Sequence, residues 1–295
     1  MKDYVVIIGR FQPVHNGHVS LINKAFEQAN KGVIVLVGSS YSPRNIKNPF
    51  TFEERRDMLE REFAPIENGI PMKTFTVVPL QDHTYRDAEW ITQVQEKVAF
   101  AVNRQGWTDF PPSVGLMGLD KDHTTSYLNW FPQWRMPDMM HEEDLNGLNA
   151  TSIRDIIFGV GKPISFIRGV VPSSTYDFLL ELKSEPFWQN LCAEHAFVAA
   201  YKSSWASAPY APTFVTVDAV VIQDGHVLMV ERGANPGKGL LALPGGFVNA
   251  NELLKDAVIR ELREETRLKV APNQLRGSII AREIFDAPDR SLRGR

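Results

Sequence analysis

Residues Gly9–His18 read G-R-F-Q-P-V-H-N-G-H, and they follow directly on the apolar run Y-V-V-I-I at residues 4–8. An apolar strand, a turn that begins with a glycine and a helix that begins near His15 form the strand–turn–helix unit of a parallel sheet. Backbone N–H groups and the positive end of the helix dipole point at such a turn, so it is a ready site for phosphate. Two imidazoles three residues apart, His15 and His18, can donate hydrogen bonds there. The stretch predicts a polyphosphate site, with a helix-capping turn of satisfied histidines as the alternative.

Short apolar runs alternate with amphipathic helical patterns through the first part of the chain. The patterns predict strands at 5–8, 33–37, 75–79 and 113–118, and helices at 18–29, 52–63 and 90–102. This alternation predicts an α/β fold with a doubly wound parallel sheet and right-handed crossovers. Ligands bind such sheets beyond the carboxyl ends of the strands, which is where the Gly9–His18 turn lies.

The composition is that of an ordinary soluble globular protein, with 43% hydrophobic and 23% charged residues. A length of 295 residues is enough for two domains, and a net charge of −3 argues against nucleic acid as the main partner. The single cysteine, Cys192, excludes an intrachain disulfide and predicts a reducing cytoplasm. No stretch is long enough to span a bilayer, and the first apolar run is too short for a signal peptide, so no membrane partner is expected. The oligomeric state stays open, with a homo-oligomer among the alternatives.

A change in composition marks the expected domain boundary. Helical patterns at 172–182 and 186–202 are followed by small and Pro-rich residues at 203–212, which suit a linker. Beyond it, Asp224-Gly225 is a hairpin signal between two apolar runs. We therefore expect a first domain at 1–185, a helix and linker at 186–210, and a second domain at 211–295.

The H-N-G-H run at residues 15–18 resembles the H-x-G-H signature of the nucleotidylyltransferase superfamily. The preceding G-R-F-Q-P run resembles the branch that makes NAD from nicotinamide mononucleotide and ATP. The resemblance implies a Rossmann-like domain that joins ATP to a phosphate-bearing acceptor and releases pyrophosphate. It places four residues of the turn at the nucleotide, namely Gly9, Arg10, Phe11 and Gly17. A glycine at position 17 lets the backbone approach the ligand closely.

The run N-A-T-S-I-R at residues 149–154 resembles the second superfamily signature, S-x-T-x-x-R, with Asn149 where serine is usual. Capping-type residues ahead of Arg154 predict a helix N-terminus. The matching positions, Thr151 and Arg154, are implied phosphate contacts, and a guanidinium can contact two phosphate oxygens at once. An ordinary capped surface helix is the alternative.

Residues 38–55 resemble the segment G-S…N-P-F-T-x-x-E-R of the NAD-forming branch, with an altered loop before the N-P-F-T run. Arg44 and Lys47 are candidates to meet the charge of the triphosphate, and Lys47 aligns better. Glu54 lies three residues after Thr51, which predicts a capping box. Arg55 is interpreted as structural, or as one partner of a surface salt bridge.

Substrate choice is expected from residues 82–90 and 118–134. The resemblance implies that Trp90 stacks on the nicotinamide ring, since aromatic faces attract planar cations. Packing of Trp90 in the core is the alternative. Asp87 or Asp120 is expected to bond the ribose or the amide.

The implied reaction needs no nucleophile from the protein. The phosphate of the acceptor attacks the α-phosphorus of ATP, while the protein aligns the two and stabilises charge. Four residues are expected to stabilise the departing pyrophosphate: His15, His18, Lys47 and Arg154. Mg²⁺ would shield the triphosphate and be held mostly by its oxygens and by water.

A second motif follows the linker, with G-F-V-N-A-N-E at 246–252 and R-E-L-R-E-E-T at 260–266. Glu261, Glu264 and Glu265 share one helix face, and a divalent cation would relieve their mutual repulsion. The motif resembles the Nudix box, G-x5-E-x7-R-E-U-x-E-E-x-G-U. Every fixed position matches except the last glycine, where Arg267 stands. A solvated acidic helix face is the alternative.

This second resemblance implies hydrolysis, dependent on Mg²⁺ or Mn²⁺, of a nucleoside diphosphate linked to another group. Glu261, Glu264 and Glu265 would hold the metal and help activate water, with Glu252 and Arg260 in support. Pairing of the two domains suggests ADP-ribose as the substrate. Arg290 and Arg293 are implied as substrate contacts.

The second domain is short for its type. Nudix domains usually continue through further strands and a final helix, whereas this chain stops at Arg295. We therefore expect an α+β Nudix fold that is incomplete, through a cut chain, a truncated gene or a partner that completes it, and that leaves a sheet edge uncovered.

Three readings of the function remain. The leading one is a cytoplasmic enzyme that makes NAD from nicotinamide mononucleotide and ATP and hydrolyses ADP-ribose. The second transfers adenylyl or cytidylyl groups to another acceptor, such as a phosphopantetheine or a flavin precursor. In the third, the Nudix domain is a non-catalytic module that binds ADP-ribose and regulates the transferase.

Overall fold

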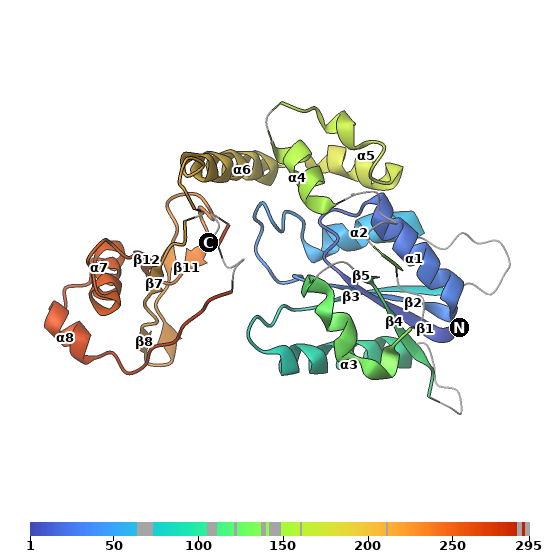
Figure 1. The fold of residues 1–295 in the computed structure, drawn as a ribbon, viewed down its shortest axis with the longest axis horizontal. Helices are drawn as coiled ribbons and strands as arrows, with labels where there is room; N and C mark the ends of the chain where they lie inside the picture. Colours follow the sequence, from blue (N-terminus) through green and yellow to red (C-terminus); the bar gives the residue numbers. More distant parts are fainter. Residues whose placement is uncertain are drawn as a thin grey trace. The chain divides into compact units, whose positions relative to one another are not determined.

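The computed structural model describes residues 1–63, 73–104, 111–120, 123–136, 140–141, 149–159, 161–210, 212–287 and 291–292. The chain divides into two compact units, unit 1 at Met1–Cys192 and unit 2 at Ala193–Arg295. The helices and strands of both are drawn in Figure 1. Among the described residues, no helix is both long and apolar enough to cross a membrane.

Unit 1 is built on a parallel sheet of four strands. They are β1 (Lys2–Gly9), β2 (Ala29–Val37), β3 (Thr74–Pro79) and β4 (Val114–Met117), in the spatial order β3-β2-β1-β4. The two inner strands, β1 and β2, are mostly buried and apolar, as strands covered on both faces must be. Because the strand order reverses at β1, the end of β1 lies where such folds bind ligands. The predicted doubly wound parallel sheet is confirmed.

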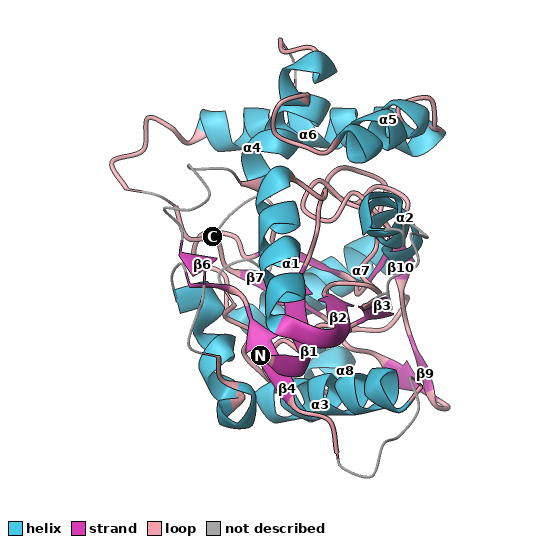
Figure 2. Ribbon diagram, turned by 90° about the vertical axis from the view of Figure 1, so that its right-hand side faces the viewer, coloured by secondary structure: helices cyan, strands magenta, loops and turns pink. Residues whose placement is uncertain are grey.

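Helices cover both faces of this sheet. On one face, α1 (Asn16–Gln28) and α2 (Phe52–Phe63) pack against side chains such as Val5, while α3 (Asp87–Asn103) covers the other face over side chains such as Val6. Figures 1 and 2 show α1 on one side of the sheet and α3 on the other. Each helix follows the strand before it, which is the crossover arrangement predicted by the sequence.

The remaining part of unit 1 adds helices to the face that carries α1. They are α4 (Ala150–Phe158), α5 (Ser173–Leu182) and the beginning of α6 (Pro186–Ser204). Three 3-10 helices (His123–Trp130, Pro132–Trp134 and Ile164–Ile167) and the short pair β5 (Leu119–Asp120) and β6 (Met140–His141) complete the described elements. The predicted helices at 172–182 and 186–202 are confirmed as α5 and α6.

The described part of unit 2 combines short antiparallel strand pairs with the later part of α6 and two further helices. The pairs are β7 (Thr216–Asp218) with β12 (Gly245–Phe247), β8 (Ile222–Gln223) with β9 (His226–Val227), and β10 (Val230–Glu231) with β11 (Leu241–Ala242). The two further helices are α7 (Leu254–Thr266) and α8 (Pro272–Gly277). The predicted hairpin is confirmed, because Asp224 and Gly225 turn the chain between β8 and β9 with φ values of 50° and 79°.

Candidate active sites in the two units

The turn between β1 and α1 has a constrained backbone. Phe11 adopts a left-handed conformation with φ of 52°, which costs a non-glycine residue conformational energy. Its ring lies against Gly9, where an added Cβ would come within 2.9 Å of the Phe11 Cζ atom. The structure therefore gives Gly9 and buried Phe11 a role in shaping the turn, while Arg10 between them is exposed.

His15 and His18 lie together at the N-terminus of α1. The backbone N–H of His15 donates to Nδ1 of His18 at 3.2 Å, and the two rings stack with centroids 3.6 Å apart. Because Nδ1 accepts, we assign the proton of neutral His18 to Nε2. Burial lowers the pKa of His15 to about 4, and burial together with the neighbouring His15 lowers the pKa of His18 well below its usual value. Both imidazoles are therefore neutral at pH 7.

The second signature supplies a cation to the same turn. Asn149 caps α4 by accepting the backbone N–H of Ser152 at 2.9 Å, which confirms the predicted helix start. Arg154, one turn along, is buried and donates to the carbonyl oxygen of Gln12 at 2.9 Å and to Oγ1 of Thr151 at 3.1 Å. Burial, and then the charge of Arg10, lower the pKa of Arg154 to about 10, so it stays cationic at neutral pH. The structure thus brings Thr151 and Arg154 to the turn.

Arg55 holds the loops around this site in place. It is fully buried and donates to four carbonyl oxygens, those of Arg10, Gly38, Ser39 and Thr51, at 2.7–3.2 Å. These oxygens belong to the chain after β1, the chain after β2 and the start of α2. The structural interpretation of Arg55 is confirmed, and the surface salt bridge is wrong. Burial lowers its pKa to about 10.

The loop expected to meet the triphosphate is only partly available for it. Arg44 forks onto Glu54 with two contacts of 2.7 Å, donates to the carbonyl oxygen of Pro49, and lies 3.8 Å from the centroid of the Phe187 ring. These contacts commit its guanidinium to the protein. Lys47 is half-buried in the same loop.

Trp90 belongs to an aromatic cluster beside the end of β1. It meets Tyr127 and Trp130 edge to face, with both centroid distances 5.8 Å. Tyr127 donates its hydroxyl to the carbonyl oxygen of Ile8 at 3.2 Å, which the sequence did not indicate. Trp90 is half-buried and packs against these rings, so it is partly a core residue. Asp87 is exposed at the start of α3.

Three predicted contacts lie outside what the structure describes. They are Arg290, Arg293 and the side chain of Asp120.

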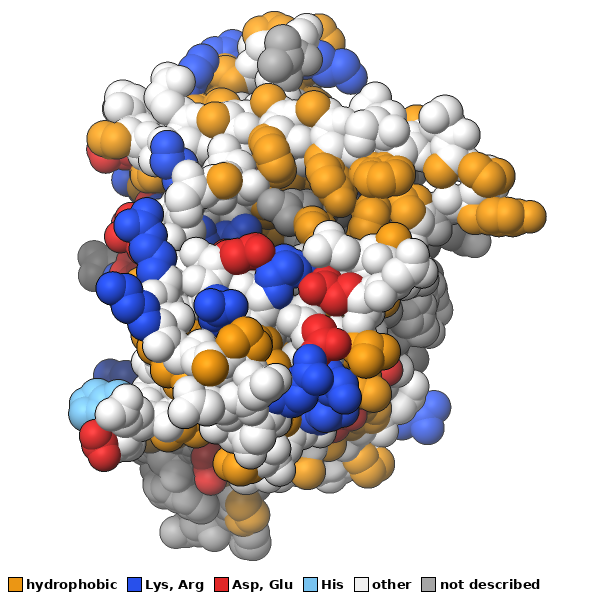
Figure 3. All heavy atoms as spheres, turned by 90° about the vertical axis from the view of Figure 1, so that its left-hand side faces the viewer, with side chains coloured by type: hydrophobic (Ala, Val, Ile, Leu, Met, Phe, Trp, Pro, Cys, Tyr) orange, Lys and Arg blue, Asp and Glu red, His pale blue; other side chains and the backbone are white. Residues whose placement is uncertain are grey.

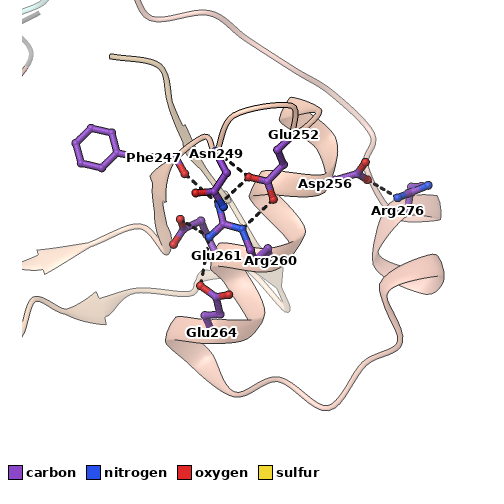
Figure 4. A network of polar contacts seen from close by, with 8 residues as sticks. All are labelled: Phe247, Asn249, Glu252, Asp256, Arg260, Glu261, Glu264 and Arg276. Carbon is purple, nitrogen blue, oxygen red and sulfur yellow. Dashed lines mark hydrogen bonds and ion pairs between the residues drawn. The ribbon is translucent and has the colours of Figure 1, made fainter. Parts of the chain in front are cut away.

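In unit 2, the guanidinium of Arg260 is the centre of a carboxylate network (Figure 4). Nε and Nη2 fork onto Glu252 at 2.8 and 2.9 Å, and Nη1 contacts Glu261 at 2.7 Å and Glu264 at 3.2 Å. Nη2 also donates to the carbonyl oxygen of Phe247 at 3.0 Å. The hydrogen bond from Arg260, followed by that from the Asn249 backbone, lowers the pKa of Glu252 to about 2, while the carboxylates raise the pKa of Arg260. The expected supporting pair, Glu252 and Arg260, does meet.

The other carboxylates of α7 lie against β12. Glu265 accepts the backbone N–H of Gly245 at 2.9 Å. A Cβ added at Gly246 would come within 2.6 Å of the Glu261 carboxylate, so only glycine leaves room for it there. Within the described residues, no three His, Cys, Asp or Glu side chains are already grouped as metal ligands. The donor set nevertheless fits Mg²⁺ or Mn²⁺, because hard divalent cations prefer carboxylate oxygens and Gly246 opens a cradle for Glu261.

Arg267 occupies the position where the Nudix pattern has its last glycine. It ends α7 in the left-handed conformation, with φ of 56°, and donates its N–H to the carbonyl oxygen of Arg263. The turn that glycine normally makes is therefore made here by arginine.

Two family models match the chain. The cytidylyltransferase-like model matches residues 6–156, and the NUDIX domain model matches residues 212–293. Among solved structures, a bifunctional NMN adenylyltransferase/ADP ribose pyrophosphatase from Francisella tularensis, complexed with AMP and a Mn ion, is 36% identical with a TM-score of 0.85. The match covers 100% of this chain and 82% of that one.

Two further relatives each match one part of the chain. A nicotinamide/nicotinic acid mononucleotide adenylyltransferase from Acinetobacter baylyi is 32% identical over 189 residues, 64% of this chain and 91% of that protein. An ADP-ribose pyrophosphatase from Methanocaldococcus jannaschii is 41% identical over 80 residues, 27% of this chain, and the match spans only 44% of that relative's length. The chain therefore belongs to the cytidylyltransferase-like family, in the bifunctional group that carries a NUDIX domain after it.

Proposed function

We propose that unit 1 transfers the adenylyl group of ATP to nicotinamide mononucleotide, giving NAD and pyrophosphate. The observation that carries this proposal is the pair of stacked, neutral imidazoles, His15 and His18, at the end of β1 with Arg154 beside them. The names of the Francisella and Acinetobacter relatives support the choice of acceptor.

The chemistry needs positioning more than covalent participation. An oxygen of the mononucleotide's phosphate attacks the α-phosphorus of ATP, and the bond to the bridging oxygen breaks, so pyrophosphate leaves with the electron pair. His18 would donate its Nε2 proton as a hydrogen bond to this developing charge, and Arg154 would neutralise it, since preorganised donors act most strongly where water is excluded. Mg²⁺, when bound, would shield the triphosphate. Lys47 is proposed as a further phosphate contact and Trp90 as a wall of the nicotinamide pocket.

The test is a panel of acceptors. Purified chain with Mg²⁺ and ATP should release pyrophosphate with nicotinamide mononucleotide, and at least tenfold less with a phosphopantetheine or a flavin precursor. Cytidine triphosphate in place of ATP tests the alternative donor. Equal rates with an unrelated acceptor would favour the second hypothesis, transfer of an adenylyl or cytidylyl group to another acceptor.

We infer that unit 2 hydrolyses ADP-ribose to two phosphomonoesters. Glu261, Glu264 and Glu265 would hold Mg²⁺ or Mn²⁺, which supplies an activated water when bound, and Arg260 with Glu252 would orient the carboxylates. The bifunctional relative and the Methanocaldococcus relative support this substrate.

One assay distinguishes a hydrolase from a non-catalytic regulatory module in unit 2. Release of AMP from ADP-ribose with Mg²⁺, lost in Glu264→Gln, is expected of a hydrolase. Binding without release is expected of a regulatory module, which the engagement of Glu261 and Glu264 by Arg260 would suit. The nucleotides ATP, NAD, nicotinamide mononucleotide and ADP-ribose are thus the proposed partners. The cytoplasm is the proposed compartment, since Cys192 is the chain's one cysteine.

A further inference from the structure

Helices α7 and α8 border an open pocket of about 430 Å³, and the proposed reactions give no role to its residues Asp256, Arg263 and Arg276. Its charged lining consists of Asp256, Arg260, Arg263 and Glu264 from α7 and Arg276 from α8. Neither Glu261 nor Glu265 lines it, so the pocket lies beside the proposed metal ligands and shares only Glu264 with them. In Figure 1, α7 and α8 are drawn at the left. Figure 3 shows the molecule from that side, and basic and acidic side chains lie next to one another on this face.

The three guanidinium groups of the pocket differ in how they are paired. Arg260 is fully engaged by carboxylates on α7 and before it. Arg276 pairs with Asp256, another residue that lines the pocket, and Figure 4 shows this contact. Within the described residues, the Arg263 guanidinium makes neither an ion pair nor a hydrogen bond, and its side chain is exposed. The pocket therefore holds one cation that is not compensated.

An anionic ligand can replace Asp256 as the partner of Arg276. Its side chains are 47% and 33% exposed, and exposed ion pairs contribute roughly 0–1 kcal/mol. A dianion that meets two guanidinium groups gains more, because charge-assisted fork contacts are among the stronger hydrogen bonds. Arg276 is thus available as a second cation beside Arg263.

We propose that this pocket binds a phosphomonoester with a small organic body, its phosphate held by Arg263 and Arg276. The volume is in the range of roughly 300–1,000 Å³ that small-molecule pockets have. Ile259 and Pro272 give it an apolar wall for the organic part. The ligand class rests on the proposed hydrolysis: water adds to one phosphorus of a diphosphate, the bond to the bridging oxygen breaks, and each half leaves as a monoester.

The test measures binding and not turnover. Ribose 5-phosphate is titrated into the full chain without metal, and binding is followed by calorimetry and by the ¹⁵N NMR signals of arginine Nε–H groups. The signals of Arg263 and Arg276 should shift, and Arg263→Gln and Arg276→Gln should each raise Kd about tenfold. Asp256→Asn should lower Kd severalfold, because it removes the competing carboxylate. Arg282→Gln, an exposed arginine outside the pocket, is the matched control and should leave Kd unchanged.

Three results would overturn the proposal. The first is no binding by the unaltered chain, and the second is binding that both arginine variants retain. The third is inorganic phosphate bound as tightly as ribose 5-phosphate, since the organic body would then contribute nothing. AMP in a parallel titration shows whether a nucleoside body is accepted in place of a sugar. ADP-ribose hydrolysis is assayed separately with metal, so failure of the pocket and failure of the hydrolase are distinguished.

Discussion

At the scale of single residues, the histidines of the β1–α1 turn link burial to reactivity. We expect His18→Ala to lower kcat of adenylyl transfer by about 10²–10³, as the loss of one preorganised donor does elsewhere, with KM changed far less. Pyrophosphate release at varied ATP concentration measures both. Asn16→Ala, an exposed neighbour at the same helix start, is the control and should keep kcat. A fall in kcat accompanied by an equally large rise in KM would contradict a role in stabilising the leaving group.

His15 also makes stability depend on pH. Its pKa is about 4 in the folded chain against an ordinary value of 6.5, so between these values the unfolded chain binds the additional proton. The free energy of unfolding of unit 1 should therefore fall on acidification from pH 6.5 to 4, by up to about 1.4 kcal/mol per pH unit from this group. Above pH 6.5 the contribution is complete. Urea unfolding at several pH values gives the dependence of the free energy of unfolding on pH, which should be weaker in His15→Gln. An unchanged dependence on pH would refute the assignment to His15.

Arg267 offers a stabilising substitution. Because it ends α7 in the left-handed conformation, Arg267→Gly should raise the stability of unit 2 by about 1 kcal/mol. Arg263→Gly, four residues earlier in the helical conformation, should lower it by a similar amount. Thermal unfolding of the two variants gives the comparison, and two shifts of the same sign would speak against the argument.

At the scale of elements, the loops after β1 and β2 depend on one buried side chain. Arg55→Ala would remove the guanidinium donor from four carbonyl oxygens, of which those of Ser39 and Thr51 keep a backbone N–H donor. Because the side chain is fully buried, we expect a loss of about 3 kcal/mol or more in the stability of unit 1. Arg56→Ala is the matched control, because its ion pairs with Asp57 and Glu60 are long and exposed, and it should change stability by less than about 0.5 kcal/mol. Chemical denaturation of both variants decides whether the neighbours differ as expected.

The elements that sequence predicted well are those set by short-range patterns. The capping box of α2 is confirmed, since Glu54 accepts the Thr51 N–H at 2.8 Å and Thr51 Oγ1 accepts the Glu54 N–H at 3.3 Å. Its two residues are three apart, so their spacing alone indicates the contact. The strands of unit 1 and the hairpin at Asp224-Gly225 were predictable for the same reason.

Arginine partners were the part that sequence could not supply. Arg44 and Arg55 have the same chemistry and lie 11 positions apart in one segment. Their partners depend on which loops the fold brings near, such as Gly38 for Arg55 and Phe187 for Arg44. The Nudix pattern likewise indicates which carboxylates share a face of α7 and implies that Arg260 supports them. It does not indicate that the guanidinium contacts Glu252, Glu261 and Glu264 at once.

At the scale of the whole molecule, the described apolar core of unit 1 is formed by residues of unit 1 itself. Its large apolar cluster runs from Val5 to Leu191, all within Met1–Cys192. A chain ending at residue 207 should therefore keep adenylyl transfer within about twofold, while ADP-ribose hydrolysis is lost. Parallel assays of the cut and full chains test this, with full-length Glu264→Gln as the control that loses only the hydrolase. Loss of NAD synthesis on cutting would show that the transferase needs unit 2.

The stacked, uncharged imidazoles of the turn predict that the binding of a nucleotide is coupled to the uptake of protons. A polyphosphate placed beside them favours their charged forms, so their pKa values rise toward the ordinary range as it binds. Below about neutral pH, binding then draws protons from the solvent, and the heat of binding carries the ionisation heat of whatever buffer supplies them. Nucleotide capture at this proposed site would therefore take up protons as well as bind an anion, and release of pyrophosphate would return those protons to the solvent.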